Sequence, residues 1–333
     1  MKFLLVRLSS MGDVILTTPA IRALHNSYPQ AEIHFLTKKA YEPLLLYHPL
    51  LQAVHSWPPS TFVCKQKWEG VIDLQRSLRT LPLRWRLRYM RYTTFPKKNV
   101  LKWIMVRQKR LIPLPHVVKR YGEALRPFGV SQEELGPIEV YFPPSIIEKV
   151  EKDLRSLNSE GGWLAVGIGG TYATKRWPIP YYETLLNRLE MPVILLGGAT
   201  EAPQCFLLAK RLKVPAVIGA GRYSLLETAA AIKLASLLLT HDTGTAHLGA
   251  AMQTPTLVLW GNTVPEFGMT PWHVPYANIE TRHLRCRPCS KLGFSACPQG
   301  HHDCMRSLTP DYVEKRIRSF YSALSKGKAY KIP

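Results

Sequence analysis

The stretch KFLLVRLSSMGDVILTTPAIRAL, residues 2–24, sets the fold class of the chain. Its first seven residues are mainly apolar, as in a short buried strand. SSMGD at 9–13 follows as a glycine-containing loop, and apolar residues then recur at helical spacing to Leu24, with Pro19 starting or kinking the helix. Strand, glycine loop and helix in this order predict the opening unit of a parallel α/β sheet.

The same alternation continues along the chain. In the first half we expect further strands at 32–36 and 70–74 and helices at 39–47 and 117–127. In the second half we expect strands at 163–168, 192–196, 236–240 and 256–260, and helices at 179–189, 201–212, 225–231 and 245–252. Alternation of this kind predicts parallel sheets with crossover helices, here in two doubly wound, Rossmann-like domains.

The length and composition agree with two globular domains. The chain has 333 residues, of which 46% are hydrophobic and 20% charged, a balance that excludes a mainly disordered or fibrous protein. Glycine, proline, serine and glutamate become frequent between 129 and 144, which indicates a connector. We therefore predict domains at 1–158 and 159–308, followed by a C-terminal segment, 309–333, whose helix is capped by Thr309 and has Pro310 at its first position.

Charge and hydropathy point to the cellular setting. No apolar run approaches the ~18–20 residues of a membrane span, and Arg7 interrupts the first apolar run too early for a signal peptide, so we expect a cytoplasmic protein. Lys and Arg outnumber Asp and Glu by 44 to 23, a net charge of +21. Fifteen Lys or Arg and a single acid, Glu123, lie between Arg76 and Arg126, which predicts an anionic partner for the first half.

Loops that follow predicted strands contain the candidate site residues. Ligands of open α/β sheets gather at the carboxyl ends of strands, where the SSMGD loop places Gly12 and Asp13. Gly12 permits close approach of the backbone. Asp13 has two interpretations, a functional carboxylate or a simple cap of its helix.

Two loops of the second half have the composition of phosphate-binding segments. GGTYATKRWP at 169–178 combines glycines with Thr171 and Lys175, although its spacing is not that of a P-loop and a solvated turn is the alternative. HDTGTAHLGAA at 241–251 places polar residues at a helix amino end, where backbone N–H groups and the helix dipole favour phosphate. The residues concerned are Asp242, Thr243, Gly244, Thr245 and His247; in the alternative interpretation Asp242 caps the helix and His247 belongs to the core.

Four of the six cysteines lie within nineteen residues, at Cys286, Cys289, Cys297 and Cys304, with His301 and His302 nearby. Clustered cysteines in a cytosolic protein favour metal or thiol chemistry over disulfides. We expect either a structural zinc or reduced thiols lining a loop. A dinucleotide dehydrogenase is disfavoured, because neither glycine loop has the G-x-G-x-x-G spacing with an acid about 20 residues later.

Taken together, these motifs resemble glycosyltransferase family 9, the heptosyltransferases that add heptose to the inner core of lipopolysaccharide. The resemblance rests on SSMGDVILTTPAIRAL at 9–24, GGTYATKRWP at 169–178 and HDTGTAHLGAAMQTPTLVLWG at 241–261. It implies a GT-B architecture of two facing Rossmann-like domains with an interdomain cleft as active site. The first domain would bind the acceptor and the second an ADP-heptose donor, and the final helix would cross back to the first domain.

The resemblance also implies roles for single residues. Asp13 would be the catalytic base, Thr171 and Lys175 would contact the donor diphosphate or sugar, and Glu201 would hold the adenosine ribose. Asp242 to His247 would form the main donor loop. Because the sequence contains no Asp-x-Asp, we expect Lys175 and the helix entrance at 243–245 to stabilise the leaving diphosphate without a metal.

The basic stretch would then bind the acceptor. Its anions are Kdo carboxylates and lipid phosphates, for which we expect Ser10, Arg76, Arg79 and Arg120 as contacts, with a peripheral association to an anionic inner-membrane surface. Each single cation has the alternative of belonging to a solvated face. Two other functions stay open: a family member that uses another nucleotide sugar for a different surface glycan, and a basic nucleic-acid-binding module, although no nucleic acid is expected as partner.

Overall fold

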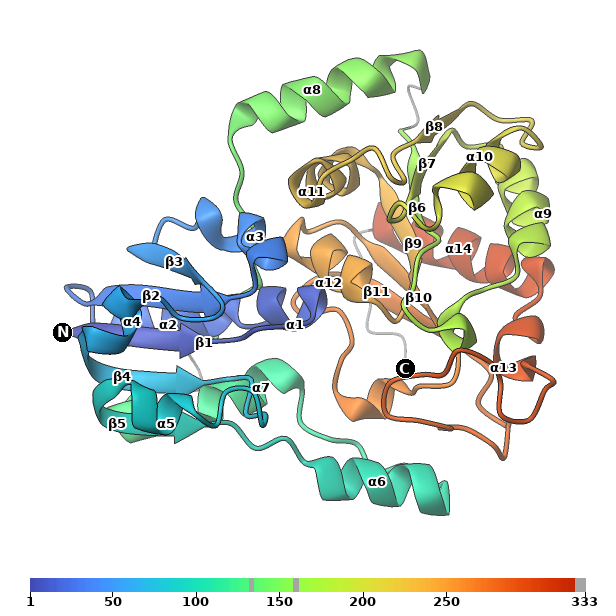
Figure 1. The fold of residues 1–333 in the computed structure, drawn as a ribbon. Helices are drawn as coiled ribbons and strands as arrows, with labels where there is room; N and C mark the ends of the chain where they lie inside the picture. The colour runs from blue at the N-terminus through green and yellow to red at the C-terminus, as the bar shows by residue number, and fades with distance from the viewer. Residues whose placement is uncertain (132–134, 158–161, 327–333) are drawn as a thin grey trace. The chain divides into compact units, whose positions relative to one another are not determined.

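The computed structural model describes residues 1–131, 135–157 and 162–326. The chain forms two compact units, Met1–Lys98 with Pro115–Pro143 and Asn99–Leu114 with Pro144–Pro333. Each unit contains one fully parallel sheet (Figure 1). The predicted class, two α/β domains with doubly wound parallel sheets, is therefore confirmed.

The first unit has a five-stranded sheet in the order β3-β2-β1-β4-β5. Its strands are β1 (Lys2–Val6), β2 (Glu32–Thr37), β3 (Ala53–Ser56), β4 (Lys67–Asp73) and β5 (Arg88–Thr94). Its helices are α1 (Met11–Ile15), α2 (Thr18–Ser27), α3 (Pro43–Leu46), α4 (Thr61–Lys65), α5 (Leu83–Arg86) and α7 (Val117–Glu123). The central strand β1 is buried because both faces of a parallel sheet are covered, which explains its apolar sequence.

The segment expected to be one helix up to Leu24 is divided into α1 and α2. The hydroxyls of Thr17 and Thr18 donate to the carbonyls of Val14 and Ile15 at 2.6 and 2.9 Å. Hydroxyls that bond to the preceding turn compete with continued helix, and Pro19 then lies in the first turn of α2, where its missing N–H costs nothing.

The second unit has a six-stranded sheet in the order β11-β10-β9-β6-β7-β8. Its strands are β6 (Leu164–Gly167), β7 (Val193–Leu196), β8 (Ala216–Ile218), β9 (Leu237–His241), β10 (Thr256–Trp260) and β11 (Tyr276–Glu280). Its helices are α6 (Asn99–Gln108), α8 (Pro144–Leu154), α9 (Ile179–Leu189), α10 (Ala202–Ala209), α11 (Leu225–Leu234), α12 (Gly244–Ala251), α13 (Asp303–Arg306) and α14 (Pro310–Ser325). Leucine-rich strands and the helices α9 and α14 form its main core.

Helix α14 begins as expected, because the Thr309 side chain accepts a hydrogen bond from the backbone N of Tyr312 and Pro310 follows at the first position. Its buried residues Val313, Ile317 and Phe320 join the core of the second unit. The described part of α14 therefore belongs to the second unit, and the expectation that 309–333 crosses back to the first domain stays a prediction. Residues 327–333 lie outside the described residues.

The division between the units differs from the predicted one. The expected boundary between 158 and 159 lies outside the described residues, and α8 packs against α11, so 144–157 belongs to the second unit (Figure 1). An earlier stretch, 99–114, also belongs to that unit. Its Met105 and Leu114 pack with Val264 and Phe267. The chain consequently passes between the units three times, after residues 98, 114 and 143.

Candidate active site

Asp13 lies in the first turn of α1, a few residues after the carboxyl end of β1. Its Oδ2 accepts hydrogen bonds from the backbone N and the hydroxyl of Ser10 at 3.1 and 2.9 Å. Its Oδ1 forms an ion pair with Arg7 at 2.7 Å and accepts a longer hydrogen bond from the Tyr121 hydroxyl at 3.4 Å. Asp13 therefore belongs to the capping box of α1, which confirms the structural interpretation, and it is also the centre of a charged cluster; its role as a functional carboxylate stays a prediction.

The charge state of Asp13 follows from its neighbours. Burial alone would raise its pKa, but the Arg7 charge and the hydrogen bonds from Ser10 outweigh burial and hold the pKa below its usual range. Arg7 is itself fixed, since its guanidinium also donates to the carbonyls of Ser9 and Leu74 at 2.8 and 2.5 Å. The carboxylate is thus ionised and oriented at neutral pH, as a proton acceptor must be.

The predicted acceptor contacts separate into two groups. Ser10, Arg76 and Arg79 are exposed, so their side chains are accessible to a ligand. Arg120 is only 1% exposed, and its guanidinium donates to the backbone carbonyls of Pro115 and Lys97. These bonds give Arg120 a structural task in holding two segments together, which corrects the expectation that it meets the acceptor.

A cavity of about 420 Å³ opens beside the carboxyl ends of β4 and β5 in the first unit. It is lined by Asp73, Arg76, Ser77, Leu78, Leu81, Arg84 and Thr94. Asp73 is buried and occupied by internal hydrogen bonds, from the Thr80 hydroxyl at 2.8 Å and the Tyr92 hydroxyl at 2.9 Å. The two guanidinium groups are therefore the charges that this cavity offers to a ligand, and they favour an anion.

In the second unit, Lys175 and Asp242 are brought together. The Lys175 ammonium contacts Asp242 Oδ2 at 2.6 Å and the Asp242 carbonyl at 2.8 Å, and the Thr263 hydroxyl donates to the same Oδ2 at 2.7 Å. These residues follow β6, β9 and β10, three adjacent strands of the sheet. Burial would raise the pKa of Asp242, but Lys175 and Thr263 lower it further than burial raises it.

A second ion pair joins Arg176 to Glu201 at 3.2 Å. Arg176 also donates to the Gly170 carbonyl at 2.7 Å, and Glu201 accepts from the backbone N of Gly198 at 3.0 Å. A Cβ at Gly198 would lie 3.3 Å from Glu201 Oε2, so glycine permits this close approach. Glu201 is 6% exposed, and Arg176 together with the glycine backbone fixes its carboxylate.

The remaining donor-site candidates occupy different depths. Thr171 is exposed in its loop, whereas Thr243, Gly244 and Thr245 are partly buried at the start of α12. Gly12 and His247 are buried, and the position of His247 agrees with the interpretation as a core histidine. Thr171 and the start of α12 are therefore the accessible members of this set.

His241, the last residue of β9, holds the loop at 169–177 against the sheet. Its Nε2 accepts hydrogen bonds from the backbone N of Trp177 at 2.9 Å and from the Tyr182 hydroxyl at 2.8 Å. Its Nδ1 lies 3.3 Å from the Gly169 carbonyl, to which the neutral ring donates. Burial lowers the pKa of His241 to about 4, so the ring is neutral at physiological pH. His241 thereby fixes both ends of the 169–177 loop to β9.

The six cysteines of the described residues are free thiols. Burial raises the pKa of Cys289 to about 11 and that of Cys304 to about 12, so both are protonated at neutral pH. Within the described parts of the chain, no three His, Cys, Asp or Glu side chains are grouped to hold a metal ion. The choice between a structural zinc and reduced thiols therefore stays a prediction that depends on the spacing of the cysteines.

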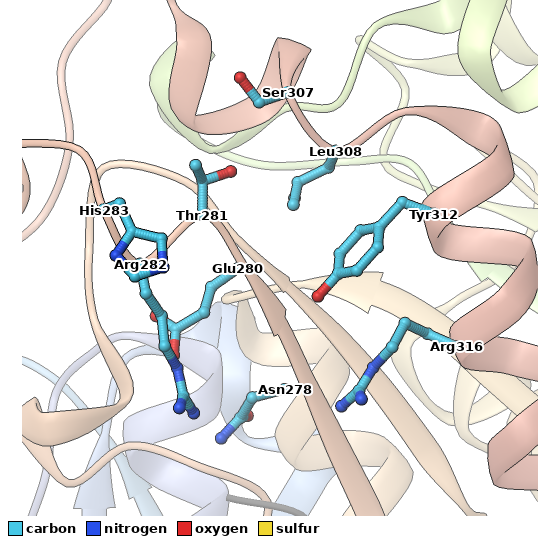
Figure 2. A pocket seen from close by; sticks show the side chains of 9 residues that line it. All are labelled: Asn278, Glu280, Thr281, Arg282, His283, Ser307, Leu308, Tyr312 and Arg316. Carbon is cyan, nitrogen blue, oxygen red and sulfur yellow. The ribbon is translucent and has the colours of Figure 1, made fainter.

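A separate cavity of about 380 Å³ lies in the second unit between β11, the loop after it and the start of α14 (Figure 2). Figure 2 shows the Tyr312 hydroxyl and the Arg316 guanidinium on one side, opposite Asn278 and Glu280. Glu280 forms ion pairs with Arg282 and Arg287. None of the candidate site residues lines this cavity, so it is distinct from the loops after β6, β9 and β10.

Several residues of these clusters were not predicted as site residues. Arg7, Tyr121, Arg176 and Thr263 belong to this group. Tyr121 lies 108 positions from Asp13 and Thr263 lies 21 positions from Asp242, distances at which no local spacing signals a contact. Arg7 and Arg176 could have been predicted from the sequence, because each is a cation in or beside a loop that follows a buried strand.

The fold first identifies the class of protein. The structure matches a family 9 glycosyltransferase from Veillonella parvula with a TM-score of 0.78 and 18% identity, covering 96% of both chains. It matches the ADP-heptose lipopolysaccharide heptosyltransferase II of Escherichia coli with a TM-score of 0.74 and 19% identity, covering 98% of this chain and 100% of the other. The two parallel-sheet units thus have the fold of these glycosyltransferases.

The sequence then identifies the family. The model of glycosyltransferase family 9 (heptosyltransferase) matches residues 61–296, and the chain belongs to this family. Among curated relatives, the lipooligosaccharide heptosyltransferase 2 of Campylobacter jejuni is 22% identical over 331 residues, with 92% of this chain and 95% of the relative covered. Among the helices of the described residues, none combines the length and apolar character of a membrane span.

Proposed function

We propose that the chain transfers heptose, with inversion and without a metal, from ADP-L-glycero-D-manno-heptose to the inner core of a lipopolysaccharide. The acceptor would be Kdo-lipid A or heptosyl-Kdo-lipid A. Family membership and the names of the relatives support the heptosyl group. The observation that carries the donor assignment is the Lys175–Asp242–Thr263 cluster at the carboxyl ends of three adjacent strands, where ligands of such sheets bind.

The reaction breaks the bond between the anomeric carbon and the β-phosphate oxygen as the acceptor oxygen attacks from the opposite face. In our proposal the acceptor proton passes to the Asp13 carboxylate. Its lowered pKa makes it a weak base, so the transfer occurs late, when the attacking hydroxyl has become acidic. ADP leaves with the bonding electron pair.

The leaving diphosphate needs positive charge in a site that excludes water. Lys175 keeps one ammonium proton beyond its two bonds to Asp242, and the start of α12 adds backbone N–H groups beside Asp242. Thr171 would assist at the diphosphate or sugar, and Glu201 would accept from the ribose hydroxyls. For the acceptor we propose that exposed Ser10, Arg76 and Arg79 meet its carboxylates and phosphates, with the enzyme acting at the cytosolic face of the inner membrane.

The test is incubation with ADP-heptose and, separately, with Kdo-lipid A and heptosyl-Kdo-lipid A, followed by mass analysis of the product. We expect one heptose to be added to one of the two acceptors. Parallel reactions with UDP- and GDP-linked sugars examine the second candidate, a different surface glycan. Transfer from those sugars without transfer from ADP-heptose would replace our proposal by that candidate.

Metal dependence is tested separately. We expect chelation by EDTA to leave the turnover unchanged, because Lys175 and the α12 amides carry the leaving-group charge. A turnover that EDTA abolishes and magnesium restores contradicts this mechanism. A structural zinc at Cys286, Cys289, Cys297 and Cys304 is a further proposal, supported by the residue type and the spacing of these cysteines. It predicts about one zinc per chain by emission spectrometry, lost in Cys286→Ser, and a metal-free protein refutes it.

A further inference from the structure

Three large apolar side chains in the first unit point outward from the segment between β4 and β5. Leu78 is 87% exposed, Trp85 is 75% exposed and Leu81 is 41% exposed. Single exposed leucines are common in proteins, but a tryptophan and two leucines exposed within eight residues of sequence, two of them lining one cavity, are unusual for a solvated surface. We call Leu78, Leu81 and Trp85 the apolar triad.

The backbone holds the apolar triad in place. The neighbouring Thr80 and Leu83 are fully buried. Thr80 donates to Asp73 and accepts from the backbone N of Ser77 at 3.1 Å, and a series of turns continues through α5. The exposed positions are therefore displayed by a segment that Thr80 and Leu83 anchor in the unit.

Positive charge surrounds the apolar triad. Arg79, Arg84, Arg86 and Arg88 are all exposed within the same segment. The sequence contains no acidic residue from 74 to 122, and Asp73, the nearest acid, is buried and satisfied internally. Such a surface suits a partner that is both anionic and apolar, and charge repels a second copy of the same basic surface.

The cavity next to the apolar triad combines the same two characters. Arg76 and Arg84 contribute its cations, while Leu78 and Leu81 contribute its apolar wall. A phosphate group would meet the guanidinium groups, and the chains attached to it would continue along the leucines. An anionic lipid presents this combination of a phosphate and apolar chains. The cavity, with a volume of about 420 Å³, leaves room for a headgroup.

We propose that the apolar triad is an interfacial anchor that inserts into an anionic lipid bilayer, with the surrounding arginines on the lipid phosphates. Tryptophan favours the boundary between headgroups and acyl chains, leucine the region below it, and each arginine near the surface adds attraction to anionic lipid. The anchor rests on the proposed function in one respect: the proposed acceptor is embedded in a membrane, so insertion would bring the enzyme to its acceptor.

The first experiment measures sedimentation with vesicles of phosphatidylcholine alone or with phosphatidylglycerol as about one third of the lipid. The variants are Trp85→Ser and, as matched control, Phe206→Ser on α10, where Phe206 is 52% exposed. We expect the wild type and Phe206→Ser to bind the anionic vesicles equally well. We expect the affinity of Trp85→Ser for these vesicles to be at least about tenfold lower. Equal binding by both variants overturns the anchor.

Two further measurements separate the alternatives. Light scattering without lipid detects a second copy as partner: a wild-type dimer that Trp85→Ser converts to a monomer overturns the anchor. Heptose transfer is then compared with the acceptor in detergent and in vesicles. We expect Trp85→Ser, which does not line the cavity, to match the wild type in detergent and to be slower on vesicles.

The same data distinguish failure of the anchor from failure of the proposed function. Vesicle binding that depends on Trp85, without heptose transfer by the wild type in detergent, leaves the anchor intact and refutes the heptosyltransferase proposal. Transfer in detergent with vesicle binding that is independent of Trp85 gives the opposite result.

Discussion

At the scale of single residues, Asp13 combines a structural and a chemical task. Replacement by Asn keeps the size of the side chain and a carbonyl oxygen for the Ser10 hydrogen bonds, but removes the charge that Arg7 compensates. We expect Asp13→Asn to lower kcat by about 10²- to 10⁴-fold, the range of a lost general base. The measurement is steady-state transfer at saturating donor.

The control for this prediction is Asp153→Asn, which removes an acid in α8 outside the Asp13 cluster and should leave kcat unchanged. ADP binding by calorimetry and thermal unfolding report whether Asp13→Asn remains folded and able to bind donor. Near-normal kcat in that variant would exclude Asp13 as the base.

His241 should make the stability of the second unit depend on pH. Burial lowers its folded pKa to about 4, so between pH 6.5 and 4 the unfolded chain binds more protons than the folded one. This stabilising contribution is complete above pH 6.5 and is lost as the pH falls, by about 2 kcal/mol at pH 5. Urea unfolding of wild type and His241→Gln at pH 7.5 and 5 should show the smaller loss in the variant; equal losses would contradict the assignment.

At the scale of elements, the loop at 169–178 is fixed to the sheet by charge. Lys175 and Asp242 are 15% and 12% exposed in their side chains, so removing one partner leaves the other poorly solvated. We expect Asp242→Asn to cost about 3 kcal/mol of unfolding free energy, and the double variant with Lys175→Met to recover part of it. Urea denaturation of the four proteins provides the coupling energy, and simple additivity would argue against the pair.

The same cation should matter for turnover. We expect Lys175→Met to reduce kcat/KM by about 10²- to 10³-fold, since it removes stabilisation of the leaving diphosphate. Lys315→Met, at an exposed position of α14, is the matched control and should retain full activity. A loss confined to KM for the donor would assign Lys175 to ground-state binding instead.

The position of a strand in its sheet explains whether the sequence predicted it. All seven predicted strands are interior strands of the two sheets, and the four that were missed, β3, β5, β8 and β11, are the four edges. Interior strands of parallel sheets are apolar on both faces, whereas an edge strand is partly exposed. β5, with the sequence RYMRYTT, therefore has the composition of a basic surface segment, and only its pairing with β4 makes it a strand.

The site was predictable to the extent that loop chemistry is local. Asp13, Lys175 and Asp242 follow apolar strands and were recognised there, and the structure adds the pairing of Lys175 with Asp242. Arg120 was misjudged because sequence does not report burial, so a cation with backbone acceptors looks like one on a solvated face. Tyr121 contacts Asp13 only through the tertiary fold.

At the scale of the whole molecule, each unit is built from two separate stretches of the chain, which passes between the units three times. A protease cut after Pro143 would leave residues 99–114 on the first fragment, although Met105 and Leu114 pack with Val264 and Phe267 of the second. We therefore expect the two pieces to elute together in native gel filtration and to separate only in denaturant. Independent elution of the pieces would show that the 99–114 packing is too weak to join them.

This interleaving has a consequence for dissecting the enzyme. No single continuous span of the polypeptide corresponds to either unit, so shortening the gene from one end would strip buried methionine and leucine side chains of their partners. An autonomous first unit would need residues 99–114 excised and Lys98 joined to Pro115 by a short linker. Evolution by exchange of whole domains would meet the same obstacle, because three junctions would have to be matched at once.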